Sequence, residues 1–375
     1  MLLALAGCSG VAAPEGWSGG VIAADKLFIG TMEGTLLALD VDSGRKLCEF
    51  ALPENTDRRD SQAIYGTPAL ANGTIFVGGY DGVLYSLPVE CGGDSDGHWE
   101  PDDSEPVGGR EPIVGGPVAV DGAVLIGSSD GSLYAFDYDY DLRDFSLRWA
   151  FPTGNKVWGA PVVAEGVAYF GSLDHKLYAV DLESGDPAWP APFEAGGAIT
   201  ATPVLEGGRL YVGAFDSVFY AIDALTGREV ERFAAAGSWY WSRAVSSGST
   251  IYAPSLDGNL YALDRDSLEE VWPAPLRTDG AIMGAPVIVG DRIAVPSMDG
   301  KLRLLRIEDG SDPRICDIGV KLRAPLYEHD GFIYFGATNH SIRALQVDSR
   351  GDPDESWVHF TNEEIPVDPY RDPDC

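Results

Sequence analysis

The sequence predicts an all-β protein, an eight-bladed β-propeller built from four-stranded antiparallel blades. Three observations predict it: one motif recurs eight times, its spacing of about 40 to 49 residues matches a propeller blade, and no stretch keeps helical apolar spacing over three turns. A single four-stranded sheet cannot bury both of its faces, so the blades are expected to stack in one closed ring. We therefore expect one domain over residues 17–360.

The repeated motif is Asp-Gly followed by alternating apolar residues, and it is clearest at residues 257–264. Asp-Gly between two strand-like runs favours a type I′ hairpin, because both residues accept a positive φ. A Gly or Pro stands three residues before each motif, and an apolar residue stands three and six residues after its start. The eight motifs begin at Glu33, Asp81, Asp130, Asp174, Asp216, Asp257, Asp299 and Asn339.

The first unit illustrates the expected strands, which cover residues 21–24, 27–31, 36–41 and 47–51. In several units an Asp closes the third strand, where its carboxylate can accept hydrogen bonds from the following turn. We interpret the aromatic residues of the fourth strands as packing between blades. These aromatic residues are Phe50, Trp149, Trp189, Phe233, Trp272 and Trp357.

Two segments depart from the repeat. The second unit carries extra residues from Cys91 to Arg110, rich in Gly, Asp, Pro and Glu, and we expect them to form a long surface loop. Residues 361–375 are rich in Pro and Asp and are expected to form a C-terminal tail.

The N-terminal residues Leu5-Ala6-Gly7-Cys8 match a bacterial lipobox, in which the signal is cut before the cysteine and lipid is attached to its sulfur. The motif ends an apolar segment, although seven residues without Lys or Arg are shorter than a full signal peptide. We interpret residues 1–8 as a truncated lipoprotein signal with Cys8 as the lipidated residue. The protein is then expected on the periplasmic side of an outer membrane or on the outer face of a bacterial cytoplasmic membrane.

Four further cysteines form an even set, as expected in an oxidising compartment. Four cysteines allow three pairings. Cys48 and Cys91 lie in neighbouring units, and Cys316 lies in the unit before the one that leads into Cys375. The pairs Cys48–Cys91 and Cys316–Cys375 are therefore the most reachable.

The formal net charge of −32 argues against binding to nucleic acid, whose phosphates would be repelled. It also disfavours flat docking on anionic lipid. The acidic segment 92–105 does not have the spacing of a calcium-binding loop.

Residues 179–189 read Ala-Val-Asp-Leu-Glu-Ser-Gly-Asp-Pro-Ala-Trp, and residues 221–229 read Ala-Ile-Asp-Ala-Leu-Thr-Gly-Arg-Glu. Both resemble the Ala-x-Asp-x-x-Thr-Gly-x-x-x-Trp repeat of pyrroloquinoline-quinone (PQQ) type propellers. That family contains the quinoprotein dehydrogenases, which are longer enzymes, and non-enzymatic members such as the BamB-type lipoproteins that scaffold outer-membrane barrel assembly. Length, eight units and the lipobox make this chain more similar to the second group. The resemblance implies a monomeric, non-catalytic envelope scaffold with protein partners.

Aromatic and basic residues gather in the loops that lead into the inner strands, which are expected to open on the same face as the Asp-Gly hairpins. Trp, Tyr and Arg are the residues that contribute most to protein interfaces. We therefore predict a partner-binding mouth in which the aromatic rings supply affinity and Arg243 supplies orientation. The alternatives are simple plugging of the channel and a site for PQQ with calcium. The predicted mouth residues are Tyr65, Lys156, Trp158, Trp239, Tyr240, Trp241, Arg243 and Arg323.

A catalytic role is the less favoured interpretation. An enzyme of the family would carry adjacent cysteines and a calcium-binding set of Glu, Asn and Asp, and the sequence has no Cys-Cys pair. His175 and His340 occupy the same turn in opposite units, too far apart to share a metal ion. We expect no enzyme activity, cofactor or metal, with a PQQ-dependent oxidoreductase or a small-molecule sensor as the alternatives.

Overall fold

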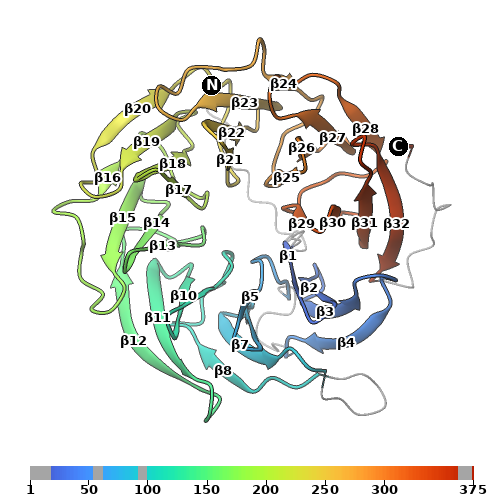
Figure 1. Cartoon of the computed structure of the whole chain (residues 1–375). Helices are drawn as coiled ribbons and strands as arrows, with labels where there is room; N and C mark the ends of the chain where they lie inside the picture. Colours follow the sequence, from blue (N-terminus) through green and yellow to red (C-terminus); the bar gives the residue numbers. More distant parts are fainter. Residues whose placement is uncertain (1–17, 54–61, 92–98, 362–373) are drawn as a thin grey trace, which may run out of the picture.

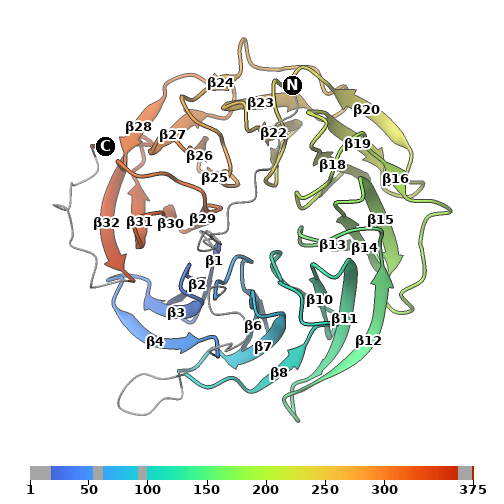
Figure 2. The ribbon, with the colours of Figure 1, turned by 180° about the vertical axis from the view of Figure 1, so that it is seen from behind.

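The chain folds into a ring of eight four-stranded sheets, seen from its two faces in Figures 1 and 2. The computed structural model describes residues 18–53, 62–91, 99–361 and 374–375. All strand pairs in the sheets are antiparallel, and the strands follow chain order from the axis outward. This is the predicted eight-bladed β-propeller. Within the described ranges no helix is long and apolar enough to cross a membrane.

Each blade consists of an inner strand beside the axis, a second strand, a third strand and an outer strand. The inner strands are β1 (Gly20–Ala23), β5 (Ala69–Ala71), β9 (Val118–Val120), β13 (Val162–Ala164), β17 (Val204–Glu206), β21 (Val245–Ser247), β25 (Val287–Val289) and β29 (Tyr327–His329). The second strands are β2 (Lys26–Gly30), β6 (Thr74–Gly78), β10 (Ala123–Gly127), β14 (Val167–Gly171), β18 (Arg209–Gly213), β22 (Thr250–Pro254), β26 (Arg292–Pro296) and β30 (Phe332–Ala337).

The third strands are β3 (Thr35–Asp40), β7 (Val83–Pro88), β11 (Ser132–Asp139), β15 (Lys176–Asp181), β19 (Phe219–Asp223), β23 (Asn259–Asp264), β27 (Lys301–Arg306) and β31 (Ser341–Val347). The outer strands are β4 (Lys46–Ala51), β8 (Asp103–Pro106), β12 (Asp144–Pro152), β16 (Phe193–Glu194), β20 (Glu229–Phe233), β24 (Leu276–Arg277), β28 (Arg314–Asp317) and β32 (Pro353–Phe360).

The expectation that residues 91–110 form only a surface loop is wrong. The outer strand β8 lies within this segment and completes the second blade. Trp99 and Val107 are buried, and the ring of Trp99 packs against Phe28 of the first blade at a centroid distance of 5.5 Å. The segment therefore contributes to the hydrophobic core between the first two blades.

The Asp-Gly hairpins are not type I′ turns, which corrects the expected turn type. In the hairpin of the sixth blade Gly258 has a φ of 84°, whereas Asp257 is not among the residues with positive φ. Ser255 and Asn259 close a three-residue loop, with the Ser255 N–H donating to the Asn259 carbonyl at 3.0 Å. This is the hairpin in which a left-handed residue follows a type I turn, so only the Gly position needs a positive φ.

In four blades of the described structure the Asp of the hairpin motif bonds to the loop that leads into the inner strand. In the sixth blade one oxygen of Asp257 accepts the N–H of Asn259 at 2.8 Å. Its other oxygen accepts the Tyr261 hydroxyl and the N–H of Gly237, both at 2.7 Å. Because Gly237 lies in the loop that leads into this blade, Asp257 fixes that loop to the hairpin. Asp174, Asp216 and Asp299 fix the corresponding loops in their own blades.

The Asp that closes the third strand accepts hydrogen bonds from the following turn, as predicted. Asp181 accepts the N–H of Ser184 at 2.8 Å, and Asp223 accepts the N–H of Thr226 at 2.8 Å. Hydrogen bonds from Ser184 lower the pKa of Asp181, and those from Thr226 lower the pKa of Asp223. These carboxylates therefore hold the turns that precede the outer strands.

Neighbouring blades are joined by what we call the interblade Trp contact. The indole N–H of a Trp that lies in the outer strand or in the segment before it donates to a backbone carbonyl of the next blade, directly after that blade's third strand. Four such bonds of 2.8–3.1 Å are present in the described structure. They run from Trp149 to Leu182, Trp189 to Ala224, Trp272 to Ile307 and Trp357 to Val41.

The same contact explains the Thr-Gly of the repeat. Gly227 has a φ of 69°, and a Cβ on it would lie 2.6 Å from Cδ2 of Trp189. Only glycine satisfies both the left-handed backbone and the close approach of the indole. The Trp in one unit and the Ser/Thr-Gly in the next are therefore the two halves of one interface.

A disulfide occupies the position of this contact between the first two blades. Cys48 pairs across its sheet with Ala38, just as Trp149 pairs with Ala135. Cys91 takes the turn position of the serine in the Ser-Gly pairs, and the two cysteines are joined. The second disulfide joins Cys316 to Cys375, so both bridges follow the pairing expected from the sequence.

The ring closes without a swapped strand in the described residues, since β1–β4 form one sheet and β29–β32 another. Side chains make the junction between them. Trp357 donates to the Val41 carbonyl at 2.8 Å, and His340 bonds to Glu33. Leu27, Ile29 and Tyr334 bury their side chains in the same core cluster.

Replacing Trp189 by Phe should lower the free energy of unfolding by about 1–2 kcal/mol, because the Phe ring fills the interface but leaves the Ala224 carbonyl without its donor. Urea unfolding followed by far-UV circular dichroism measures the change. Trp239→Phe is the matched control, since Trp239 is 48% exposed and should tolerate the same substitution. Equal stability of the two variants would contradict a stabilising role for the interblade Trp contact.

The bonds between Tyr and Asp predict loss of stability in alkali. Burial and the hydrogen bond to Asp257 raise the pKa of Tyr261 to about 12. An unfolded tyrosine titrates near pH 10, so this stabilisation is complete below about pH 10 and is lost between about pH 10 and pH 12. Tyr261→Phe should therefore lose less stability than the wild type over this interval in urea unfolding. Tyr140→Phe, whose hydroxyl makes no bond to an Asp in the described structure, should behave like the wild type.

Candidate functional site

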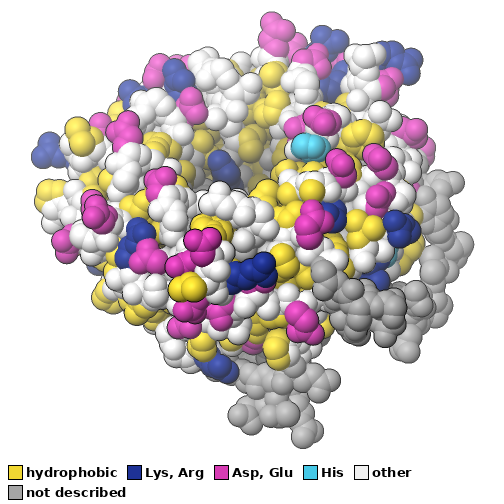
Figure 3. All heavy atoms as spheres, turned by 60° about the horizontal axis from the view of Figure 1, so that its bottom comes forward, with side chains coloured by type: hydrophobic (Ala, Val, Ile, Leu, Met, Phe, Trp, Pro, Cys, Tyr) yellow, Lys and Arg dark blue, Asp and Glu magenta, His cyan; other side chains and the backbone are white. Residues whose placement is uncertain are grey.

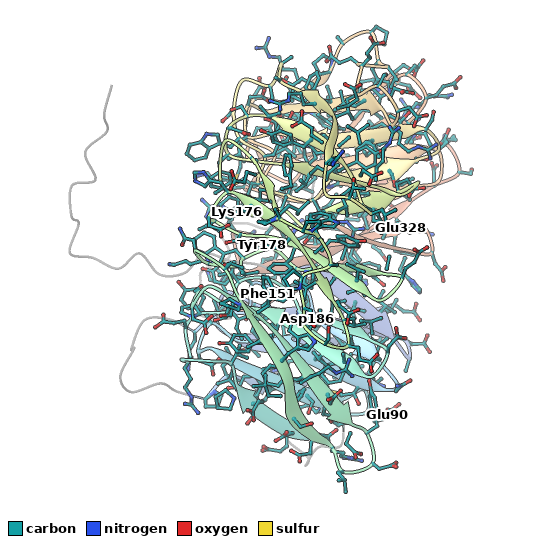
Figure 4. The ribbon with its side chains drawn as sticks, turned by 90° about the vertical axis from the view of Figure 1, so that its left-hand side faces the viewer. Glu90, Phe151, Lys176, Tyr178, Asp186 and Glu328 are labelled. Carbon is teal, nitrogen blue, oxygen red and sulfur yellow. A yellow bond between two sulfur atoms is a disulfide. The ribbon has the colours of Figure 1, made fainter. Side chains whose placement is uncertain are left out.

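One face of the ring carries the hairpins between second and third strands together with the loops that lead into the inner strands. Because successive strands alternate in direction, both sets of connections meet on this side, which we call the hairpin face. In Figure 4, Lys176 and Tyr178 lie toward this side, whereas Asp186, Glu328 and Glu90 lie toward the opposite one. The oblique view in Figure 3 shows acidic, basic and hydrophobic side chains interspersed over the surface it presents.

Four aromatic side chains form a continuous row on the hairpin face, which we call the aromatic row. Trp239 stacks on Phe215 at a centroid distance of 4.8 Å, and Phe215 stacks on Trp241 at 5.8 Å. Trp241 contacts Trp158 at 6.3 Å. The Trp239 side chain is 48% exposed, whereas the other three are partly buried. The row therefore offers apolar ring surface to a binding partner.

The row joins residues of three consecutive blades. Trp158 precedes the inner strand of the fourth blade, Phe215 lies in the hairpin of the fifth, and both Trp239 and Trp241 precede the inner strand of the sixth. The fifth blade has the small residues Thr200 and Ala201 at the corresponding place. Because these residues are small, the indoles of the fourth and sixth blades come into contact across them.

Basic groups accompany the row. The ammonium group of Lys156 lies 5.3 Å from the centre of the Trp158 ring, a cation–π geometry. The Trp158 indole N–H donates to the Ser129 hydroxyl at 2.9 Å, which fixes the ring. The Arg243 side chain is exposed, and desolvation by its surroundings lowers the pKa of its guanidinium.

The row borders the central channel, a cavity of about 970 Å³. Five of the predicted mouth residues line this channel, whereas Lys156 and Trp239 are exposed beside it on the hairpin face. The residues in the lining are Tyr65, Trp158, Trp241, Arg243 and Arg323.

Tyr240 is the exception, and its assignment to the mouth is wrong. The chain from Trp239 to Trp241 is extended, so the middle side chain points the other way. Tyr240 is only 1% exposed and packs against Phe219 at a centroid distance of 5.4 Å. Burial raises the pKa of Tyr240. This ring belongs to the core between the fifth and sixth blades and cannot contact a partner.

Phe215 is a member of the row that sequence reasoning missed. It stands one residue before the Asp216 motif, at a hairpin position that holds residues as different as Met32, Tyr80 and Thr338 in other blades. The available signal was that this position always lies at a hairpin tip beside the connecting loop. The predicted lipidation residue Cys8 lies outside the described residues.

A site for PQQ with calcium would require several oxygen ligands for the metal ion in the channel lining. In the described part of the chain, no group of three or more His, Cys, Asp or Glu side chains could hold a metal ion. Glu328 is the carboxylate in the channel lining, and it already accepts the N–H of Gly331 at 2.9 Å. Calcium prefers six to eight oxygen ligands. The described lining therefore does not fit a calcium–quinone site.

Three solved structures resemble the chain in fold. The computationally designed Ika8 protein has 16% sequence identity and a TM-score of 0.72, covering 89% of this chain and 97% of that one. BamB from Moraxella catarrhalis has 16% identity and a TM-score of 0.70, covering 88% and 94%. Quinohemoprotein alcohol dehydrogenase from Comamonas testosteroni has 12% identity and a TM-score of 0.68, covering 89% and 71%.

No curated protein sequence matches the chain. The family described as outer membrane protein assembly factor BamB matches residues 16–140, 138–230 and 217–312. These matches cover the Asp-x-x-Ser/Thr-Gly turns and most of the interblade Trp contacts described above. The chain therefore belongs to this family of PQQ-like β-propellers.

Proposed function

We propose that this protein is a non-catalytic envelope lipoprotein that acts as a protein-interaction scaffold, with a BamB-like role in outer-membrane protein assembly. The aromatic row carries the proposal. A stacked series of rings that begins at an exposed Trp exceeds what packing of the channel needs. Such rings are the usual energetic centres of protein interfaces.

The geometry suits an extended segment of a partner. The Phe215–Trp241 and Trp241–Trp158 ring distances of 5.8 and 6.3 Å are close to the roughly 6.6 Å between alternate side chains of a strand, whereas Trp239 and Phe215 lie nearer each other, at 4.8 Å. Apolar side chains at alternate positions of the segment can therefore each cover one ring. Lys156 and Arg243 supply hydrogen-bond donors beside the apolar surface.

Two features support a location outside the cytoplasm. Two disulfides join four of the five cysteines, as expected for an oxidising compartment. Cys8 then remains as the cysteine for the proposed lipid anchor. Family membership supports the same compartment.

A PQQ-dependent oxidoreductase is the rival proposal, supported by the fold shared with the quinohemoprotein alcohol dehydrogenase. That likeness is one of fold, and the acceptor set expected for calcium is missing from the described lining. Titration of the protein with PQQ and calcium separates the two proposals. The scaffold proposal predicts no tight binding and no dye reduction with alcohols or aldoses.

The scaffold proposal is tested by cross-linking the lipidated protein in its own envelope and identifying captured proteins by mass spectrometry. Trp158→Ala and Trp241→Ala should each reduce capture of a specific partner at least about tenfold, because each removes a ring of the row. Leu225→Ala is the control, since Leu225 is 84% exposed at a turn on the opposite face. Unchanged capture by both Trp variants would rule out this site.

A further inference from the structure

The charges beside the aromatic row are distributed unlike those of the whole chain. Acidic residues outnumber basic ones by 58 to 26. In the described channel lining, however, the carboxylate is that of Glu328. Glu328 lies on β29 near the side opposite the hairpin face (Figure 4). This carboxylate therefore lies away from the aromatic row, whereas Arg243 follows Trp241 of the row by two residues.

Arg243 has no counter-ion in the described residues. Two buried arginines, by contrast, are matched with carboxylates: Arg292 with Asp312 at 2.6 Å and Arg303 with Asp299 at 2.6 Å. No such bond from Arg243 is present in the described structure, and desolvation alone lowers its pKa. A partly desolvated guanidinium without an acceptor favours a carboxylate supplied from outside.

We propose that this site selects partner segments in which an acidic residue follows alternating apolar residues, with the carboxylate bound by Arg243. The inference rests on the proposed function and specifies the chemistry of the segment. Apolar side chains cover the rings of Trp239, Phe215 and Trp241, and the acidic side chain enters the channel. Charge complementarity supports this choice, because the net charge of the chain repels an acidic segment, whereas the guanidinium of Arg243 attracts its carboxylate.

Two fluorescent, amidated peptides test the inference. One reads Ser-Leu-Ser-Phe-Ser-Leu-Ser-Glu-Ser and the other replaces its Glu by Gln, so the pair differs only in charge. Fluorescence anisotropy with the full-length protein should show the Glu peptide binding at least about tenfold more tightly, as expected for a charge-assisted hydrogen bond. Arg243→Met should remove that preference, and Arg228→Met, which removes an exposed charge on the opposite face, should retain it.

The outcomes separate this inference from the proposed function. If Trp241→Ala weakens both peptides equally and the wild type does not distinguish Glu from Gln, the carboxylate site is wrong while the aromatic site stands. A Glu preference that survives Arg243→Met also overturns the assignment. If neither peptide binds at millimolar concentration, the inference fails irrespective of the envelope cross-linking result. Thermal unfolding of each variant verifies that Arg243→Met and Arg228→Met remain folded.

Discussion

Docking of one blade against the next is the constraint on which this ring depends. A four-stranded sheet leaves both faces apolar, and the buried clusters lie between blades, as where Tyr211 and Phe219 meet Ile251 and Leu263. Apolar packing supplies most of the stabilisation, but it is non-directional and does not fix how one blade is oriented on the next. The indole N–H of the interblade Trp contact adds direction, because it must reach one carbonyl of the next blade. The disulfide Cys48–Cys91 takes this position at one junction, so a covalent bond replaces the hydrogen bond where the second unit is irregular.

The aromatic row follows from the same architecture. Once the blades are docked, Asp174, Asp216, Asp257 and Asp299 each fix a connecting loop, and those loops determine where the side chains of the hairpin face lie. Trp239 and Trp241 alternate with Tyr240 on an extended loop, so two rings reach the surface and one joins the core. Small residues in the fifth blade let the rings of the fourth and sixth blades meet. The aromatic row is therefore a product of rigid loops, which reduces the entropy lost when a partner binds.

Much of the fold could be predicted because the same sequence motif recurs in every blade. Eight copies of one motif fixed the blade number and the strand positions, and the strands of the first blade agree with expectation to within a residue. The outer strand of the second blade was not predicted, because the buried Trp99 stands in a sequence segment whose Gly, Asp and Pro residues are typical of a surface loop. The turn type was wrong because Asp-Gly also fits a longer hairpin in which only Gly is left-handed. Five mouth residues line the channel as expected, but burial of Tyr240 and the participation of Phe215 depend on side-chain direction and on contacts between blades.

Photo-cross-linking from the aromatic row tests the central claim most directly. A photoreactive phenylalanine analogue placed at position 239, and separately at position 225 on the opposite face, would be irradiated in cells that express the full-length protein. We expect a discrete cross-linked adduct from position 239 and none from position 225. Adducts from position 225 alone would place the binding surface on the other side of the ring and rule out the aromatic row.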